Sequence, residues 1–259
     1  MKPLLRCLLI AVSLLCLGSM QVNTEISVVE RLECMRDNTP DRLRIGQLHI
    51  SPKDGAENLP PVQGRLYLRR DKKQLRVMMQ LTAPQDLAGT RYLLNETDQG
   101  DRFYVYLPAL GKTRAIQAGG EGAQIAGTGL SYADLRLITQ SVGGAAINLQ
   151  GRKVIDGRST QLLRFSTPGG QYERMIVALD DESCASLRVE LHDKKGLAKR
   201  YVAQSSSLRQ VGNFRYFAVG QLENRRGAQT ATLRLREVSA PKKLSSKLFD
   251  PKRFHQASE

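Results

Sequence analysis

The spacing of apolar residues changes once along the chain, from the period of a helix to the period of a strand. Within residues 25–35, Val28, Leu32 and Met35 recur at the i, i+4, i+7 spacing that places side chains on one face of a helix. The segment Asp37-Asn-Thr-Pro40 ends this predicted helix. Beyond it, apolar and polar residues alternate, which is typical of strands with one buried and one solvated face.

The clearest alternation predicts a hairpin near the start of the strand-rich region. Leu66 and Leu68 fall on one face of its first strand, and a charged turn at residues 70–73 leads into its second strand. In that second strand Arg76 and Gln80 alternate with four apolar residues, which are Leu75, Val77, Met79 and Leu81. Turn-forming stretches recur every ~8–12 residues from here on, so we expect about ten to thirteen strands and two or three helices.

This pattern is typical of one mainly β domain, an antiparallel barrel or sandwich. No serine- or proline-rich linker divides residues 20–259, so we expect a single domain over that range. Glycines are dense between residues 119 and 129. Their density indicates an ordered loop or a mobile flap rather than a linker.

The N-terminus is predicted to be a secretory signal peptide, with residues 1–19 removed by cleavage. A basic start at Lys2 precedes an uncharged apolar run over residues 7–17, and Ser19 supplies a small residue near the cleavage point. A transmembrane anchor is the rival interpretation, but a span requires roughly 20 apolar residues. Lipid attachment at Cys16 fits poorly, because a leucine precedes it. We therefore expect a soluble protein of the periplasm.

Two cysteines, Cys34 and Cys184, remain after the predicted signal peptide is removed. An oxidising compartment favours a disulfide between them over two buried free thiols. In the chain-entropy model, closing a loop of ~150 residues stabilises the folded state by roughly 4–5 kcal/mol.

The chain is strongly basic. Loss of Lys2 and Arg6 with the signal peptide lowers the formal net charge from +14 to +12. A basic surface favours anionic partners. Export and the lack of interleaved aromatic residues argue against nucleic acid. Anionic lipid head groups fit the compartment better, although solubility alone also explains the charge.

Residues with catalytic or metal-binding potential form no recognisable site. His49, His192 and His255 lack neighbours at metal-ligand spacing. The carboxylates of residues 180–182 fit a turn. The sequence contains no phosphate-binding loop, nucleophile elbow or zinc motif. We therefore expect no catalysis, no metal and no cofactor.

The most distinctive stretch lies between residues 103 and 135. Ser131-Tyr-Ala-Asp134 resembles a helix capping box, in which the Ser131 hydroxyl accepts from the Asp134 amide and the Asp134 carboxylate accepts from the Ser131 amide. A pairing of Asp134 with Arg114 or Lys112 is a further hypothesis.

A longer motif runs through the same stretch. The pattern that it resembles is Tyr-Leu-Pro, then Leu-x-Lys-x-Arg-x-Ile, then Gly-Thr-x-Phe-Ser-Tyr-Glu-Asp-Leu, which members of the LolA-like family of periplasmic outer-membrane lipoprotein-sorting proteins carry. The sequence matches it at Tyr106, Leu107, Pro108, Leu110, Lys112, Arg114, Ile116, Gly127, Thr128, Ser131, Tyr132, Asp134 and Leu135. It departs at Gly129, Leu130 and Ala133, where Asp, Phe and Glu are usual.

The resemblance implies a fold and a cavity. The fold is an open, strongly curved antiparallel sheet, a half-barrel covered by helices, that holds an apolar cavity. The residues expected to line the cavity share the inward face of the predicted strands and the helix after Ser131; they are Leu66, Leu68, Val77, Met79, Leu81, Leu94, Phe103, Val105, Leu107, Leu135 and Ile138. The same residues would serve equally in a filled core, and a register shift of one residue would turn them outward.

The resemblance also implies a function. The expected function is a carrier that binds lipid or lipoprotein acyl chains and moves them toward the outer membrane, with the 119–129 loop and the helix at Ser131 acting as a lid. An inner-membrane transporter and an outer-membrane acceptor are the implied partners. The alternative is a periplasmic lipid sensor or regulator that contacts a membrane protein or transporter. An enzyme would require a convergent acid–base pair, which the sequence does not display.

Overall fold

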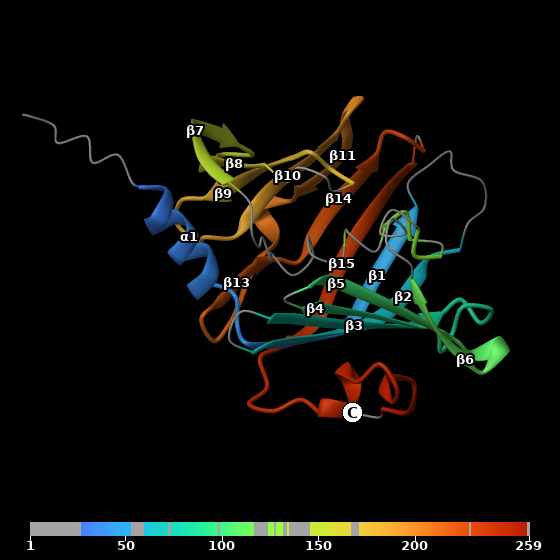
Figure 1. Cartoon of the computed structure of the whole chain (residues 1–259). Helices are drawn as coiled ribbons and strands as arrows, with labels where there is room; N and C mark the ends of the chain where they lie inside the picture. The colour runs from blue at the N-terminus through green and yellow to red at the C-terminus, as the bar shows by residue number, and fades with distance from the viewer. Residues whose placement is uncertain are drawn as a thin grey trace, which may run out of the picture.

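A computed structural model describes residues 27–52, 60–71, 74–97, 99–116, 124–126, 128–131, 134, 146–166, 171–227 and 229–257. In these ranges the chain forms one large antiparallel sheet, the helix α1 (Val28–Asp37) and several short 3-10 helices (Figure 1). The predicted mainly β architecture is confirmed. The predicted cover of helices is not supported, because α1 is the one α-helix in the described ranges. The predicted signal peptide lies outside them.

Thirteen strands form the main sheet within the described ranges. They are β1 (Arg42–Pro52), β2 (Val62–Asp71), β3 (Gln74–Ala83), β4 (Arg91–Thr97), β5 (Gly100–Leu107), β6 (Lys112–Ile116), β7 (Ala146–Ile155), β8 (Arg158–Ser166), β9 (Arg174–Asp180), β10 (Ser186–Asp193), β11 (Gly196–Ala203), β14 (Val219–Asn224) and β15 (Gln229–Ser239). A separate hairpin is made by β12 (Leu208–Val211) and β13 (Phe214–Phe217). None of the described helices is long and apolar enough to cross a membrane.

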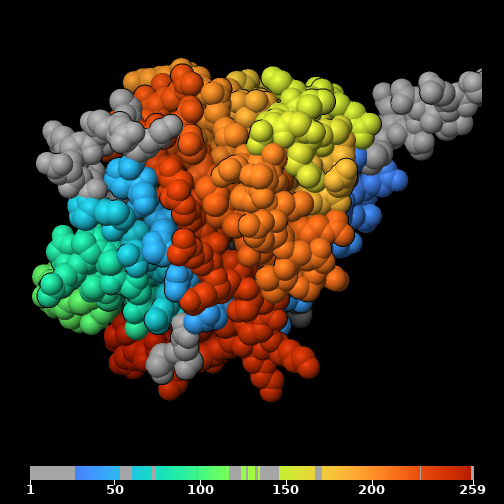
Figure 2. All heavy atoms as spheres, turned by 180° about the vertical axis from the view of Figure 1, so that it is seen from behind, coloured from blue at the N-terminus to red at the C-terminus, as the bar shows by residue number. Residues whose placement is uncertain are grey.

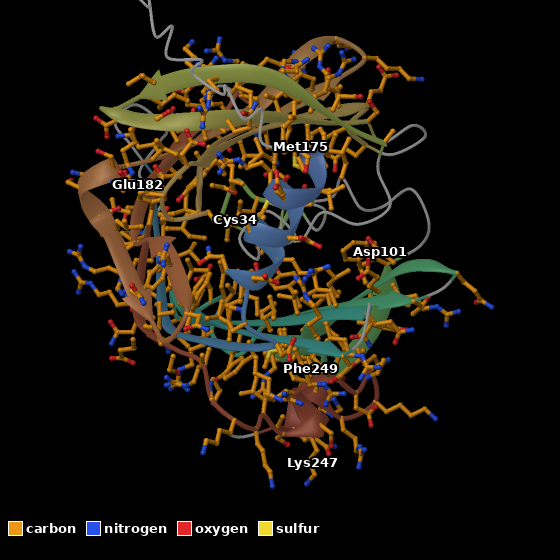
Figure 3. All side chains as sticks on the ribbon, turned by 90° about the vertical axis from the view of Figure 1, so that its left-hand side faces the viewer. Cys34, Asp101, Met175, Glu182, Lys247 and Phe249 are labelled. Carbon is orange, nitrogen blue, oxygen red and sulfur yellow. A yellow bond between two sulfur atoms is a disulfide. The ribbon has the colours of Figure 1, made fainter. Side chains whose placement is uncertain are left out.

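The sheet is open and curved. Its spatial order is β6-β5-β4-β3-β2-β1-β15-β14-β11-β10-β9-β8-β7, so β6 and β7 are its two edges. The pairing of β1 with β15 joins the two ends of the chain, and Figure 2 shows these strands side by side on the outer surface. Figure 3 shows the two arms of the sheet facing each other, with α1 between them. The expected open half-barrel sheet is therefore confirmed.

Alternation along the strands gives the sheet two apolar faces in its first arm. On the concave face, one row of register partners runs across β1 to β5 through Leu43, Leu68, Val77, Leu94 and Phe103. On the convex face, the neighbouring row runs through Arg44, Tyr67, Met78, Leu93 and Tyr104. The concave row belongs to the main apolar core.

The convex row is covered by the C-terminal segment, residues 244–257, which we call the strap. It contains the 3-10 helices η4 (Ser246–Phe249) and η5 (Phe254–Gln256). Its side chains Leu248, Phe249, Phe254 and Ala257 pack against Tyr67, Met78 and Leu93. Arg91 on β4 donates from Nη1 to the carbonyl oxygens of Phe254, at 2.5 Å, and Ala257, at 2.9 Å. These contacts add donors for backbone carbonyls of the strap, which has little regular backbone pairing of its own.

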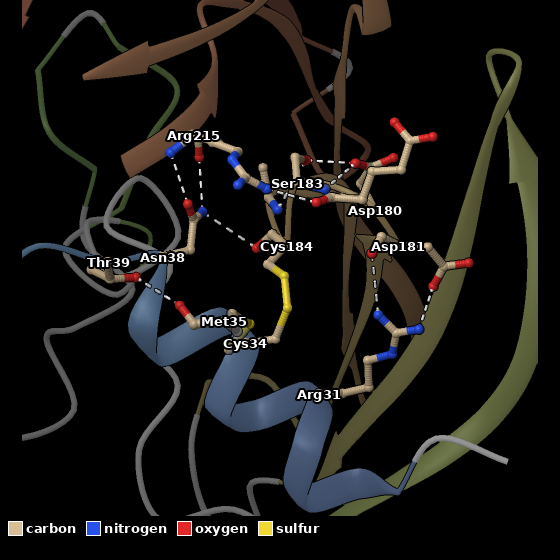
Figure 4. Close-up of a disulfide and its surroundings, with 12 residues drawn as sticks. Arg31, Cys34, Met35, Asn38, Thr39, Asp180, Asp181, Ser183, Cys184 and Arg215 are labelled. Carbon is tan, nitrogen blue, oxygen red and sulfur yellow. Dashed lines mark hydrogen bonds and ion pairs between the residues drawn. A yellow bond between two sulfur atoms is a disulfide. The ribbon is translucent and has the colours of Figure 1, made fainter. Parts of the chain in front are cut away.

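The helix α1 is fastened to the second arm of the sheet. Ser27 and Glu30 form a capping box at its start, and Met35 packs into an apolar cluster built from β8, β9 and β10. The predicted disulfide between Cys34 and Cys184 is confirmed (Figure 4). It ties the helix to the turn after β9.

Polar contacts reinforce the same attachment of α1 (Figure 4). Arg31 pairs with Asp181 at 2.8 Å. Asn38 accepts from the Arg215 amide at 2.7 Å and donates to the Arg215 carbonyl at 2.8 Å. The helix is therefore held by covalent, ionic and apolar contacts together.

Candidate functional site

The residues expected to line a cavity lie together on the concave face. Eight of them, Leu66, Leu68, Val77, Met79, Leu81, Leu94, Phe103 and Val105, belong to the main apolar core, and Leu107 packs at its margin. Leu135 and Ile138 lie outside the described residues. The expected strand register is thus the one observed, because all nine described residues meet in one cluster. Whether they contact a ligand stays a prediction.

The interior contains an apolar hollow, placed further along the sheet than those residues. It encloses about 60 Å³. Its lining comes from both arms of the sheet, the β12–β13 hairpin and one interior loop; the residues are Leu43, Ile45, Leu130, Ser186, Val189, Tyr201, Phe214, Tyr216, Phe217, Ala218, Leu222, Leu233, Leu235 and Val238. This volume admits a few water molecules, whereas pockets for drug-sized ligands usually hold about 300–1,000 Å³. An acyl chain therefore requires the hollow to expand.

Tyr201 on β11 occupies the middle of the interior. It packs against both the main core and the cluster beneath α1. Its ring lies over Gly220, where an added Cβ would come within 2.5 Å of the ring. Burial raises the pKa of Tyr201 to about 12. Gly220 therefore has no side chain because the tyrosine occupies that space.

A second hollow opens toward the rim of the half-barrel. This mouth hollow encloses about 180 Å³ and is lined by Ile50, Pro52, Gln124, Thr128, Gly129, Leu222, Asn224, Gln229, Thr230 and Ala231. Leu222 lines both hollows. The two spaces are therefore neighbours along β14.

A short interior segment separates the two hollows. We call it the plug, meaning the described residues 124–126, 128–131 and 134. Ile125 donates its amide to the Leu130 carbonyl at 2.8 Å, which closes the plug into a compact turn. Ile125 and Leu130 both belong to the main core and are at most 2% exposed. On the far side, the Tyr92 hydroxyl on β4 accepts from the Ala126 amide at 3.4 Å.

The plug carries a buried ion pair. Asp134 is fully buried, and its carboxylate pairs with the ammonium of Lys199 on β11, which is 5% exposed. The same carboxylate accepts from the Ser131 amide at 2.7 Å and from the Tyr172 hydroxyl at 3.0 Å. Lys199 also donates to the Gly129 carbonyl at 3.3 Å. Burial and the neighbouring Asp134 charge raise the pKa of Tyr172, so its hydroxyl stays a donor.

This geometry corrects the hypothesis for Asp134. Its cationic partner is Lys199, whereas Lys112 and Arg114 are exposed on the edge strand β6. The capping contact from the Ser131 amide to the Asp134 carboxylate is confirmed. The Asp134 amide, however, donates to the Ser131 carbonyl at 3.0 Å rather than to the hydroxyl. The expected helix after Ser131 lies outside the described residues.

The sequence motif does not form one site. Tyr106 lies at the convex face, where its ring stacks on His255 of the strap at 4.8 Å between centroids. Pro108 starts the 3-10 helix η1 (Pro108–Leu110) at the turn into β6. Ser131 and Asp134 belong to the plug on the concave face. Gly127 and Tyr132 lie outside the described residues.

The remaining candidates for chemistry have structural partners or lie apart. His49 and His192 face the convex side on β1 and β10. Asp180 accepts from Arg158 at 2.6 Å and from the Ser183 amide at 2.8 Å, in the expected turn. Among the residues that the structure describes, no group of three His, Cys, Asp or Glu side chains is placed to hold a metal ion.

Sequence reasoning missed Lys199, Tyr172 and Tyr201. The sequence did contain a sign that Lys199 points inward. Lys199 lies two residues from Tyr201 on β11, so the two side chains share the inward face of the strand. A lysine at an inward position of a strand is uncommon unless it is paired. Its partner Asp134 is 65 residues away in the sequence, so the pairing itself left no local pattern.

The architecture and its interior define a class: an open antiparallel half-barrel with an apolar interior, as in LolA-like proteins. A LolA superfamily protein from Nitrosomonas europaea shares the fold, with a TM-score of 0.65 and 12% identity over 87% of this chain and 98% of its own. A domain assigned to the outer membrane lipoprotein-sorting proteins of Vibrio parahaemolyticus gives a TM-score of 0.76 and 18% identity over 88% and 97%. A DUF1329 family protein from Desulfovibrio piger gives 0.76 and 21% over 85% and 94%.

Sequence comparison places the chain in a family. Residues 73–256 match a family model whose description is "uncharacterized protein". Because the match spans more than half of the chain, the protein belongs to this family. No functionally curated protein matches the sequence. The solved structures from Nitrosomonas europaea and Vibrio parahaemolyticus confirm the expected resemblance to LolA-like proteins at the level of the fold.

Proposed function

We propose that the protein is a periplasmic carrier that binds acyl chains of lipids or lipoproteins in the half-barrel and moves them toward the outer membrane. The observation that carries this proposal is the apolar interior between the two arms of the sheet. Both hollows lie there, and the apolar hollow is lined almost entirely by aliphatic and aromatic side chains. Each methylene buried in such surroundings contributes ~0.8 kcal/mol. A single chain could therefore be held firmly once it fits.

The plug supplies a means of making room. Leu130 forms part of the wall of the apolar hollow, and Gly129 and Thr128 line the mouth hollow. Withdrawal of the plug would join the two hollows and open them at the rim. The plug then acts as the lid of the carrier, and a lipid enters when it moves aside.

We propose no catalytic role for the buried cluster. Asp134 and Lys199 are an inward-facing titratable pair, which is the arrangement that an enzyme would need. Both oxygens of Asp134 are already occupied, however, by Lys199, the Ser131 amide and Tyr172. A general base must reach the proton that it removes, and this buried carboxylate is already bound by three donors of the protein.

Native mass spectrometry of the mature protein purified from a bacterial periplasm tests the function. We expect copurified lipid or acylated peptide that is released by organic solvent. Uptake of a fluorescent fatty acid by the delipidated protein should accompany it, and Ala218→Trp, on the wall of the apolar hollow outside the plug, should reduce that uptake by filling the hollow. Lys252→Trp, an exposed position on the strap, is the matched control. A protein free of lipid that also takes up no fatty acid would falsify the proposal.

A further inference from the structure

The buried cation of the interior is not explained by stability. Lys199 is the one lysine with a buried side chain among the described residues. A buried ion pair loses so much hydration that well-packed apolar residues usually replace it without loss of stability. An apolar interior would therefore be as stable, or more stable, without Lys199 and Asp134. The pair calls for a role other than holding the fold together.

Lys199 stands at the junction of the two hollows. Its register partner on β14, Asn224, lines the mouth hollow. Tyr201, two residues further along the same face of β11, lines the apolar hollow. The ammonium also contacts the carbonyl of Gly129, a plug residue at the mouth. A ligand that spans both hollows would thus pass directly over Lys199.

The carboxylate of Asp134 is the same kind of group as an anionic lipid head, and it occupies the position next to Lys199. Its carboxylate receives a charged donor from Lys199 and a neutral donor from the Tyr172 hydroxyl. Lys199 lies on β11 and Tyr172 lies just before β9, so neither belongs to the plug. If the plug withdraws, the buried ammonium of Lys199 remains and loses both Asp134 and the Gly129 carbonyl. Leaving a buried cation without these partners is costly, so an incoming anion would be favoured there.

We propose that Lys199 and Tyr172 form a head-group site for an amphiphile with a carboxylate or phosphate head, and that Asp134 of the plug occupies this site when the protein is empty. The head would replace Asp134, and the acyl chain would enter the apolar hollow past Tyr201 as Leu130 leaves. This inference rests on the proposed carrier function and adds the class of ligand and the contact that the ligand must displace.

Binding of two matched probes tests the head-group site. The probes are a fluorescent fatty acid and its methyl ester, which share the chain and differ in the charge of the head. Asp134→Asn keeps the shape of the side chain and removes the competing charge. We expect it to bind the fatty acid about tenfold more tightly than the wild type does, because a built-in competitor lowers apparent affinity. Affinity for the methyl ester should change by less than about twofold, since the ester makes no ionic contact.

The double variant Asp134→Asn, Lys199→Met removes both charges without leaving either one unpaired. It should bind acid and ester equally. Tyr172→Phe, which removes only the neutral donor, should weaken binding of the acid by a few fold and keeps the test open if the double variant fails to fold. The control is Lys195→Met, which removes an exposed lysine and should preserve the preference for the acid.

Each outcome separates the two proposals. If the double variant still prefers the acid, or if Asp134→Asn binds acid and ester as the wild type does, the head-group site is wrong while lipid binding stands. If no variant and no wild-type sample binds either probe, the carrier function itself fails. Acetate and inorganic phosphate alone should neither bind nor raise the melting temperature of Asp134→Asn. Strong protection by either one would show a site for free anions and would overturn the assignment to lipid.

Discussion

The strap and the plug cover opposite faces of the same sheet, and they are held in different ways. The strap lies on the convex face through Leu248, Phe249 and Phe254, with backbone carbonyls bound by Arg91. The plug lies on the concave face and combines two apolar anchors with the buried pair of Asp134 and Lys199. One cover is fastened by packing and by hydrogen bonds to its backbone carbonyls, whereas the other also depends on a buried ion pair.

The difference indicates which cover can be exchanged. An apolar contact between strap and sheet can be replaced only by other apolar surface, and the strap shields such surface from water. A charge–charge contact can be replaced by any anion that reaches Lys199. In the proposed carrier, the plug is therefore the cover that we expect a ligand to displace, and we expect the strap to stay in place.

The largest expected effect comes from breaking the strap. Phe254 is 0% exposed, and Phe254→Ala should lower the free energy of unfolding by about 3–5 kcal/mol through lost burial and a new cavity. Urea denaturation measures this change, with Lys252→Ala as an exposed control. Affinity for fatty acid should be unchanged below the unfolding transition. A tenfold loss of that affinity would contradict the assignment of the strap to the fold alone.

Breaking the plug contact should cost somewhat less. Lys199→Met leaves Asp134 buried without its cation, which usually costs about 3–5 kcal/mol. We expect about 3 kcal/mol, the lower end of that range, because the plug can swing out and rehydrate the carboxylate. Urea denaturation of the single variant and of Asp134→Asn, Lys199→Met measures the difference. The double variant should recover most of the loss; equal losses in both would mean that packing, and not charge, holds the plug.

Removing the polar fastening of the strap should have a smaller effect again. Arg91→Met removes a donor from the carbonyl groups of Phe254 and Ala257, and the Phe254 carbonyl then keeps only the Ala257 amide at 3.4 Å. An unpaired buried polar group costs about 1–3 kcal/mol, and the end of the strap can reach water, so we expect about 1–2 kcal/mol in urea denaturation. Arg91→Lys, which retains one donor group, should lose less. A loss as large as that of Phe254→Ala would show that the strap also depends on charge.

Alternation of apolar and polar residues was enough to predict the first arm of the sheet. Leu68 and Val77 were assigned to the same face of a hairpin, and they are register partners on the concave face. The helix around Met35 and the bond between Cys34 and Cys184 were predicted as well, since one rests on spacing and the other on elimination. Each of these predictions depends on residues close in sequence or on a choice with few alternatives.

The covers were not predictable in the same way. Apolar residues in the strap do not recur at helix or strand spacing. The strap is positioned by packing against the convex row, which includes Tyr67, Met78 and Leu93. The plug was expected to be the start of a helix, and its charged partner was sought on the nearby β6. The observed partner, Lys199, comes from β11 because the curvature of the sheet brings the second arm over the plug. The local pattern of apolar and polar residues does not predict that curvature.

The smallest expected effect concerns alkaline pH and again separates the two covers. Burial and the charge of Asp134 raise the pKa of Tyr172 above its ordinary value. An unfolded tyrosine loses its proton near pH ~10, so above that pH the unfolded state binds fewer protons than the folded state does. The free energy of unfolding should therefore be unaffected below that pH and should fall above it.

Tyr172→Phe should flatten this alkaline decline when unfolding by urea is followed at several pH values above neutrality. Tyr201, whose pKa is also raised, to about 12, leaves a second contribution in place, so the decline should become shallower without disappearing. Phe254→Ala should retain the full slope although it is less stable overall, because it affects only the strap. A Tyr172→Phe protein with the wild-type slope would mean that the tyrosine reaches water and does not serve the plug as a buried donor.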